Sequence, residues 1–256
     1  MKKLAFLFVT LMTVVTACKD KDNTTPDNSK KYLKKVISVE AGVTTIYNLT
    51  YDAQHRILTS DREDGVETRH FAYNDKGLLS TVTLKQDKDH DIYAFTYNAA
   101  GEPQTGSHEI YMEGALAATE NYQYTLANGK VTQIRSVTVT PEGEDVTIYK
   151  LSYTGANFTK MISEGAAGEV IVTLTYGNKK SPYAGFLMKY ALVPSLAFEL
   201  YSPNEMLTMN FDYVGGGPNF ASTVTYTYGA DGFPTKSITK FDDNTPDGDV
   251  TATFEY

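Results

Sequence analysis

The stretch Tyr73–Leu84, YNDKGLLSTVTL, decides the fold because it joins an aromatic residue, a polar turn and an alternating segment. Asn74, Asp75 and Gly77 are residues that bond their own backbone or tolerate positive φ, as a tight turn requires. After the turn, apolar and polar residues alternate with the two-residue period of a half-buried β-strand. The stretch therefore predicts an antiparallel hairpin.

Variants of this unit recur along the chain from Tyr51 to Tyr256. Before each turn the pattern is apolar-x-apolar-x-Tyr, with polar or small residues between, so one face of the sheet is apolar and the other is wet. The anchor tyrosines of the repeats are Tyr51, Tyr73, Tyr97, Tyr124, Tyr153 and Tyr176. They are 22 to 29 residues apart. This spacing has room for two strands and two turns, but not for helical or four-stranded repeats.

Repeats of two strands predict an all-β, antiparallel up-and-down meander, which curls so that its apolar faces meet. We expect roughly sixteen strands in a single domain over residues 32–256, curled into a barrel or half-barrel. A membrane-spanning barrel is the rival, since alternation alone does not say which face points outward. Several expected strands are shorter than the roughly nine to eleven residues that a spanning strand needs. The prediction is therefore a barrel or half-barrel that does not cross a membrane.

The N-terminus, Met1–Ala17, has the pattern of a secretory signal. Lys2 and Lys3 precede an apolar run of about a dozen residues, which is too short to span a bilayer comfortably. Val15-Thr16-Ala17-Cys18 resembles a lipobox, and Cys18 is the only cysteine in the chain. An ordinary signal peptide with an incidental cysteine is the alternative. We predict cleavage before Cys18 and lipidation of its thiol.

The segment that follows, Cys18–Lys31, is CKDKDNTTPDNSKK, which is polar and without periodicity. This composition predicts a flexible tether. Lys19, Asp20 and Asp22 resemble the charged export signal of surface lipoproteins of Bacteroidota. They favour an outer-membrane lipoprotein that faces the cell surface, with the periplasmic face as the alternative.

Tyr51-Asp52 and Tyr73-Asn74 begin segments that look like degenerate YD (tyrosine-aspartate) repeats. With its N-terminus, the whole chain resembles an uncharacterised lipoprotein family of gut Bacteroidota that has a porin-like fold. The resemblance implies a curled antiparallel sheet and no known activity. Only Tyr51 is followed by Asp, and Tyr153-Thr154-Gly155 has lost the acidic position.

The chain is acidic, with a formal net charge of −8, and removal of the signal takes away two lysines and no acid. An acidic protein is a poor partner for nucleic acid and for anionic head groups, which reward clustered Lys and Arg. We therefore expect membrane contact through the lipid anchor only. The ligand classes that stay open are a glycan, a peptide or a protein.

Catalytic and metal motifs are missing from the sequence. Residues 215–217 are glycines, but no Lys-Ser/Thr follows them, so they do not form a phosphate loop. The four histidines, His55, His70, His90 and His108, fall in different predicted hairpins, which indicates surface or strand-end positions. No G-x-S-x-G motif is present. We predict no catalytic residue, no cofactor and no metal site, and thus a protein that is not an enzyme.

Two acidic runs, residues 87–91 and 242–249, offer oxygen ligands of the kind that calcium takes. Neither has the Asp-x-Asp-x-Asp-Gly spacing with a closing Glu. Solvated hairpin turns are the main interpretation, and a calcium site is the alternative.

The segment Tyr183–Pro194, YAGFLMKYALVP, breaks the repeat because its apolar residues run together. It predicts a short helix or buried loop that plugs one end of the curled sheet, with a ligand lid as the alternative. The chain also carries nineteen tyrosines and twelve phenylalanines but no tryptophan. These aromatics indicate either cross-strand packing along one face or a groove that stacks on a sugar or peptide.

We therefore predict a lipid-anchored protein of the cell envelope that acts as a surface binding or scaffolding module. A periplasmic carrier of an apolar ligand and a surface glycan hydrolase are the alternatives. Sixteen strands enclose more space than their own side chains readily fill. A ligand is therefore expected on the tyrosine-bearing concave face, near Tyr183–Pro194.

Overall fold

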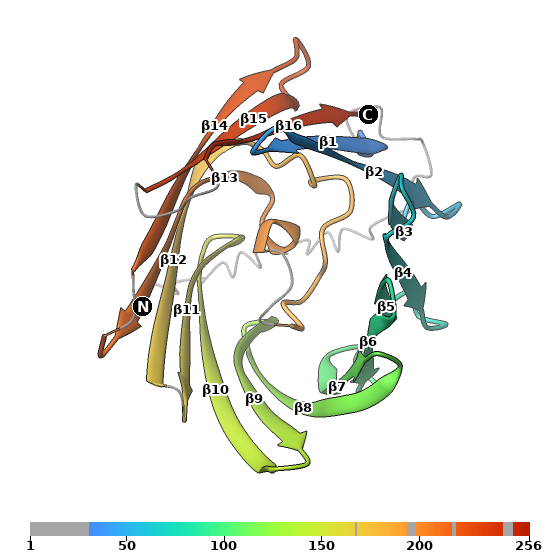
Figure 1. The fold of residues 1–256 in the computed structure, drawn as a ribbon, viewed down its shortest axis with the longest axis vertical. Coiled ribbons are helices and arrows are strands. Elements are labelled where there is room, and N and C mark those ends of the chain that lie inside the picture. Colours follow the sequence, from blue (N-terminus) through green and yellow to red (C-terminus); the bar gives the residue numbers. More distant parts are fainter. Residues whose placement is uncertain (1–30, 167, 194–197, 217–218, 243–247) are drawn as a thin grey trace, which may run out of the picture.

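The computed structural model describes residues 31–166, 168–193, 198–216, 219–242 and 248–256. In this part of the chain, sixteen antiparallel strands close into one barrel, in which each strand pairs with its neighbours in sequence and β1 pairs with β16 (Figure 1). The roughly sixteen-stranded meander is thus confirmed, and it forms a closed barrel. The predicted signal, Cys18 and the tether up to residue 30 lie outside the described residues.

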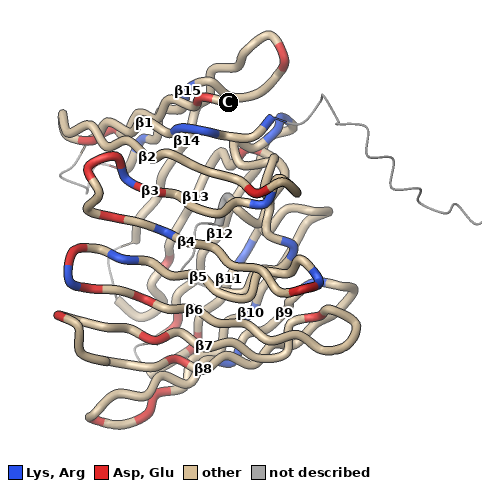
Figure 2. The backbone as a smooth tube through the Cα atoms, turned by 90° about the vertical axis from the view of Figure 1, so that its right-hand side faces the viewer, with Lys and Arg blue, Asp and Glu red and all other residues tan. Residues whose placement is uncertain are grey.

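The strands are β1 Lys35–Glu40, β2 Val43–Tyr51, β3 Ile57–Arg62, β4 Glu67–Tyr73, β5 Leu79–Gln86, β6 Asp89–Tyr97, β7 Pro103–Met112, β8 Ala115–Ala127, β9 Lys130–Thr140, β10 Gly143–Thr154, β11 Asn157–Gly165, β12 Gly168–Lys180, β13 Asn204–Val214, β14 Phe220–Tyr228, β15 Pro234–Phe241 and β16 Val250–Glu255. A 3₁₀ helix, η1, spans Phe198–Tyr201. Side by side in Figure 2, the strands run between two rings of turns. We call the ring at which the even-numbered strands end the plugged end, and the opposite ring the far end.

Anchor tyrosines follow β-bulges at the plugged end. The register shifts immediately before Tyr51, Tyr73, Tyr97, Tyr153, Tyr176 and Tyr228. A bulge bends its strand and redirects the side chains next to it. In these six even-numbered strands the tyrosine therefore lies where the strand turns at the barrel rim, whereas in β8 the shift follows Tyr124, between Thr125 and Leu126.

Five anchor hydroxyls extend the sheet where backbone pairing stops. Tyr51, Tyr73, Tyr97, Tyr153 and Tyr256 donate to the carbonyls of Leu33, Ile57, Leu79, Val131 and Pro234. Each carbonyl lies two residues beyond the last backbone pair of the two strands concerned; Ile57, for example, lies two residues before the Thr59–His70 pair. A buried carbonyl needs a partner. The tyrosine supplies it while its ring packs inside the barrel.

The residue after the anchor tyrosine caps the turn. Asp52 Oδ1 accepts the N–H groups of Gln54 and Arg56, at 2.9 and 2.8 Å. Asn74 Oδ1 accepts those of Lys76 and Leu78, each at 3.0 Å. Asn and Asp present the same oxygen to the backbone, which explains why the repeat tolerates either residue.

The apolar face of the meander points inward. Its buried core includes fully buried Tyr122, Ile134, Phe158 and Val172. A smaller core around Leu33, with Leu49, Ile57 and Phe254, lies beside the β1–β16 seam. Both cores are lined from several strands, so the barrel is held by packing around its whole circumference.

The outer wall is polar. Threonine hydroxyls pair across neighbouring strands, as in Thr50–Thr59 at 2.9 Å and Thr96–Thr105 at 2.7 Å. Charged residues lie opposite outward isoleucines in the registers: Ile92 with Glu109, Ile148 with Arg135 and Glu164, and Ile162 with Lys150. A lipid-facing wall instead needs a continuous apolar band about 25 Å tall with aromatic girdles.

Strand length does not separate spanning from non-spanning barrels here. Strands β1, β3 and β16 have six residues each, as the expectation of short strands requires. Strands β8 and β12 have thirteen residues each, long enough to cross a bilayer. The expectation that several strands are short is therefore confirmed, but the long strands show that length alone does not argue against a spanning barrel.

No helix among the described residues is long and apolar enough to cross a membrane.

Replacement of Tyr153 by Phe should test the anchor hydrogen bond. The hydroxyl lies 2.9 Å from the carbonyl of Val131, a residue with 0% exposure. Removing it leaves a buried acceptor unpaired, so Tyr153→Phe should lower the free energy of unfolding by about 1–3 kcal/mol in urea titrations. Tyr213→Phe, at a residue with 42% exposure, is the matched control and should change it by less than about 0.5 kcal/mol. Equal losses in the two variants would contradict the proposed role of the bond.

Candidate functional site

The connection between β12 and β13 enters the barrel (Figure 1). We call its described residues, 181–193 and 198–203, the plug. Tyr190, Ala191, Leu192 and Val193 are buried and belong to the main core. The sequence expectation of a short helix or buried loop is met by turns and extended chain over 181–193, while the 3₁₀ helix lies later, at Phe198–Tyr201. Pro194 lies outside the described residues.

Hydrogen bonds attach the plug to the wall on several sides. Tyr124 donates its hydroxyl to the Leu192 carbonyl at 2.9 Å, and Tyr190 donates to the Gly101 carbonyl at 3.2 Å. Across the barrel, the Phe158 N–H donates to Ser202 Oγ at 3.0 Å. The hydroxyl of Tyr124 thus donates to a carbonyl of the plug, whereas Tyr73 and Tyr97 donate to a carbonyl of the preceding strand. The plug is a fixed part of the interior.

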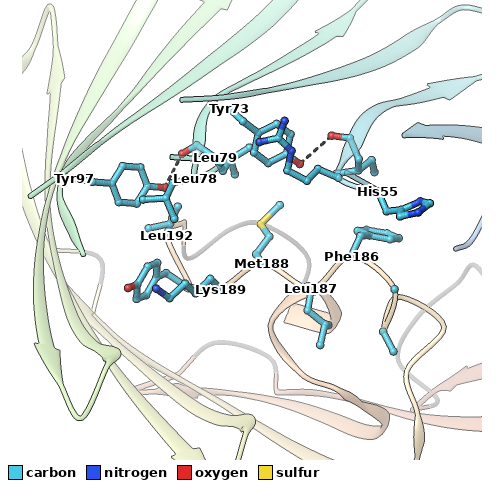
Figure 3. Close-up of a pocket in the computed structure, with 16 residues that line it drawn as sticks. His55, Tyr73, Leu78, Leu79, Tyr97, Phe186, Leu187, Met188, Lys189 and Leu192 are labelled. Carbon is cyan, nitrogen blue, oxygen red and sulfur yellow. Dashed lines mark hydrogen bonds between the residues drawn. The ribbon is translucent and has the colours of Figure 1, made fainter. Parts of the chain in front are cut away.

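A pocket of about 380 Å³ lies between the plug and the turns that join β2 to β3 and β4 to β5. Its wall and floor are mainly apolar: Ile57, Leu78, Leu79, Phe186, Met188 and Leu192. In the view of Figure 3, Met188 lies between Tyr97 on one side and Phe186 on the other. This volume falls in the range of small-molecule sites, roughly 300–1,000 Å³. The pocket lies on the tyrosine-bearing face beside the plug, which is the region where the sequence analysis expects a ligand.

The pocket's tyrosines present rings rather than free donors. Tyr73 donates to the Ile57 carbonyl at 2.9 Å and Tyr97 to the Leu79 carbonyl at 2.6 Å, as the dashed lines in Figure 3 mark. Burial raises the pKa of each of these two tyrosines to about 12, so both hydroxyls stay protonated near neutral pH. These two anchor tyrosines therefore line the pocket, and Tyr97 also packs against the main core; stacking on a sugar or peptide stays a prediction.

His55 occupies a strained position at the rim of this pocket. The equivalent turn position holds Gly77, Gly101 or Gly232 in other repeats, at φ values of 73°, 78° and 79°. His55 adopts φ 62° and lines the pocket, with its ring stacked on Tyr32 at 4.5 Å. A left-handed conformation costs a side-chain-bearing residue about 1–2 kcal/mol. Such strain is concentrated at functional sites in many proteins.

A second pocket, of about 240 Å³, shares Ile57 and Phe186 with the first. It also contains Tyr47 and Arg69, whose polar atoms are bound to Glu67: the Tyr47 hydroxyl at 3.0 Å and Arg69 Nε at 2.8 Å. The polar groups of this second space are thus largely committed to one another.

A buried polar cluster lies on the inner wall of β6, β7 and β8. His108 is 7% exposed and stacks on the Tyr93 ring at 4.0 Å. Its Nδ1 lies 3.2 Å from Glu120 Oε2, and its Nε2 lies 3.3 Å from Asp91 Oδ1. The Tyr122 hydroxyl also donates to Glu120. The hydrogen bond from His108, with that from Tyr122, holds the pKa of Glu120 below its ordinary value, against the effect of burial.

The prediction of surface or strand-end histidines is wrong for His108. It holds for exposed His55 and His70. His108 lies mid-strand on the inward face, and the alternation of Pro103–Met112 contains the signal: His108 shares its face with Gly106 and Ile110. The sequence could not show its partners, because they come from neighbouring strands.

Only part of the first acidic run forms a turn: residues 87–88 make the hairpin turn, whereas Asp89–Asp91 belong to β6. Asp89 Oδ1 accepts the Glu113 N–H at 2.7 Å, and Asp91 belongs to the His108 cluster. Residues 243–247 lie outside the described residues. Within those that the structure does describe, no group of three His, Cys, Asp or Glu is arranged to hold a metal ion.

The far end differs in character from the plugged end. Large apolar residues are exposed in or near its hairpin tips: Val39, Val43, Val66, Met112, Leu116, Val139, Val146, Tyr213 and Val214. We call this set of exposed residues the apolar rim; exposed charged residues such as Asp64 and Glu113 lie in the same turns. The plugged end carries the start of the described chain, where Lys31 pairs with Asp231 and Leu33 is buried.

A closed, plugged barrel of sixteen antiparallel strands belongs to the porin-like class of folds. Two crystal structures share it: a porin-like protein from Bacteroides vulgatus ATCC 8482 (TM-score 0.59, 11% identity, 88% of this chain and 98% of that chain) and one from Bacteroides uniformis ATCC 8492 (TM-score 0.55, 15% identity, 88% and 97%). At these identities the similarity establishes the fold alone. No family model and no curated protein matches the chain.

Replacement of Glu120 by Gln should change how stability depends on pH. Because the folded pKa of Glu120 is depressed, its contribution is present above the unfolded value near 4.3 and is lost as pH falls through the folded value. Glu120→Gln should lower the free energy of unfolding by about 1–3 kcal/mol at pH 7, and this loss should shrink below about pH 4. Urea titrations across pH measure it. Glu144→Gln, at an exposed position, is the control; a pH-independent loss in Glu120→Gln would contradict the expectation.

Proposed function

We propose that this protein is a binding module of the cell envelope, held by a lipidated Cys18, whose barrel does not span a membrane. The polar outer wall is the observation that carries this proposal. Threonine pairs and charged residues cover positions that a lipid-facing wall would fill with apolar side chains. The plug supports it further, because bonds from Tyr124 and Tyr190 fix it in the interior, where a diffusion pore would need open space.

The tether is consistent with anchoring at one end of the barrel. The described chain starts at Lys31, at the plugged end, thirteen residues after Cys18. Thirteen residues reach at most about 45 Å. The plugged end would then face the anchoring membrane, and the far end would face away from it. The similar Bacteroides structures are described as porin-like, which fits an envelope location.

Binding is favoured over catalysis because the two largest polar groups of the interior consist of side chains that contact one another. His108 lies between Asp91 and Glu120, and Glu67 binds Tyr47 and Arg69. The pocket beside the plug offers about 380 Å³ with buried apolar residues on one side, a volume in the range of small-molecule sites. Turnover by the purified protein in a hydrolase screen would favour the alternative of a surface glycan hydrolase.

Scaffolding is the second candidate function. The apolar rim at the far end supports it, because exposed apolar patches of this kind mark sites of protein contact. With the anchor at the plugged end, this rim would be the part presented to a partner protein. If the protein faces the cell surface, as the sequence predicts, the apolar rim can contact proteins outside the cell.

Solubility and conductance test the non-spanning barrel. The chain from residue 19 contains every strand, so it should stay monodisperse in buffer without detergent, as followed by light scattering and circular dichroism. Added to planar lipid bilayers, it should produce no stepwise conductance. Insolubility without detergent, or stepwise conductance, would contradict the proposal.

Replacement of Cys18 by Ala tests the anchor. A clickable fatty acid fed to cells should label the wild-type protein, and Cys18→Ala should abolish the label and release the protein from the membrane fraction. Ser38→Ala, which leaves the predicted lipobox intact, is a labelling control. Protease treatment of intact cells then distinguishes the cell surface from the periplasm. Digestion of the protein in intact cells supports the cell surface. Protection in intact cells, together with cleavage after lysis, supports the periplasm.

A further inference from the structure

We propose that the pocket beside the plug binds an anionic amphiphile: one negatively charged head group on an unbranched acyl chain. This inference deepens the proposed binding function and rests on it. Its evidence is the gradient of side chains from rim to floor, the state of the pocket's hydroxyl groups, and the sign of its charges.

The pocket changes from polar to apolar with depth. His55 and Lys189 are exposed at its rim, while Ile57 and Leu192 are buried at its floor. Between them lie the flexible thioether of Met188 and the ring of Phe186 (Figure 3). An amphiphile matches this gradient, because its chain leaves water at the floor while its head stays hydrated at the rim.

The hydroxyl groups of the pocket are poorly suited to a sugar. Three tyrosines line it, and Tyr73, Tyr97 and Tyr190 all donate to main-chain carbonyls. Their rings face the space without a free donor. A glycan would bring many hydroxyls that need partners, and unpaired polar groups are costly to bury. An acyl chain has none.

The charge of the lining is opposite to that of the whole chain. The protein has a formal net charge of −8, yet the lining contains Arg56, Lys189 and His55 and no Asp or Glu. Arg56 is already bound to Asp52, with Nη2 2.6 Å from Oδ2. Lys189 Nζ lies 4.8 Å from the Tyr190 ring, and no carboxylate of a described side chain forms an ion pair with it. Lys189 is thus the group available to an anionic head.

The strained turn supports the same assignment. His55 holds a conformation that glycine occupies in the equivalent turns, and it thereby places an imidazole at the rim. Its ring stacks on Tyr32, close to the start of the described chain. The pocket therefore opens where the tether toward Cys18 begins, on the side that an anchored protein turns to the lipid surface.

Ligand binding to the chain from residue 19 tests the proposal. Isothermal titration with laurate, below its micelle concentration, should give saturable binding with one site. The uncharged 1-dodecanol should bind about twofold to fivefold more weakly, as expected for one exposed ion pair, and acetate should not bind. Laurate affinity should fall as salt increases. Equal affinity for laurate and dodecanol would overturn the proposal, and so would the absence of binding both to laurate and to the anionic vesicles described below.

Variants locate the site. Lys189→Met should weaken laurate about twofold to fivefold and leave dodecanol unchanged. Lys236→Met removes the same charge from the outer wall and should change neither. Met188→Trp should fill the pocket and weaken both ligands at least tenfold. Circular dichroism checks whether Met188→Trp is folded. If it is misfolded, Met188→Ala is measured in its place; this variant enlarges the space and should keep binding. Laurate binding that survives Met188→Trp in a folded protein would place it elsewhere and overturn the assignment.

Two sources of the ligand are distinguished by a second arm. Monomeric laurate represents a free amphiphile, and vesicles of phosphatidylglycerol, compared with phosphatidylcholine, represent a lipid head group at a surface. Capture of either anionic form supports the proposal, and capture of neither overturns it. These measurements use the unanchored chain, so a failure here is separate from loss of Cys18 labelling or from stepwise conductance.

Discussion

The structure depends on satisfying main-chain carbonyls at the barrel rim, where backbone pairing stops before the strands end. The anchor tyrosines meet this constraint, because a hydroxyl at the end of a long, rigid ring reaches a carbonyl of the preceding strand while the ring fills the interior. At Tyr51, Tyr73 and Tyr97 a bulge before the tyrosine redirects its side chain, and the Asp or Asn after it caps the turn. One short motif therefore ends a strand, closes a turn and contributes to the core.

The same constraint explains the plug. Tyr124 donates to the Leu192 carbonyl of the plug rather than to its neighbouring strand, so the connection between β12 and β13 takes the place of one rim contact. The pocket results from this arrangement: plug and wall meet through hydrogen bonds at a few points, and between them Met188 and Phe186 face Tyr73 and Tyr97 across unfilled space. Packing and ligand space are thus built from the same residues.

The outward face of the strands is rich in threonine and differs in character from the apolar inward face. Threonine suits a strand because its β-branched side chain packs well on the pleat, and its hydroxyl pairs with a neighbour or with water. A barrel wall of such residues gains little from contact with lipid. Strands β8 and β12 are nonetheless long enough to cross a bilayer, so strand length and the polarity of the outer wall are independent features of this barrel.

From the sequence alone follow the all-β class, the approximate number of strands and the position of the plug, whereas the inward direction of the apolar face was decided by the structure. The features that follow from the sequence are local: they depend on period-two alternation, on turn residues and on one break at Tyr183–Pro194. Tertiary structure alone decided that the sheet closes through β1 and β16, that His108 meets Asp91 and Glu120, and that His55 shares a pocket with Lys189. These pairs join residues far apart in the chain. Their distances depend on the curvature of the whole barrel, which no local pattern encodes.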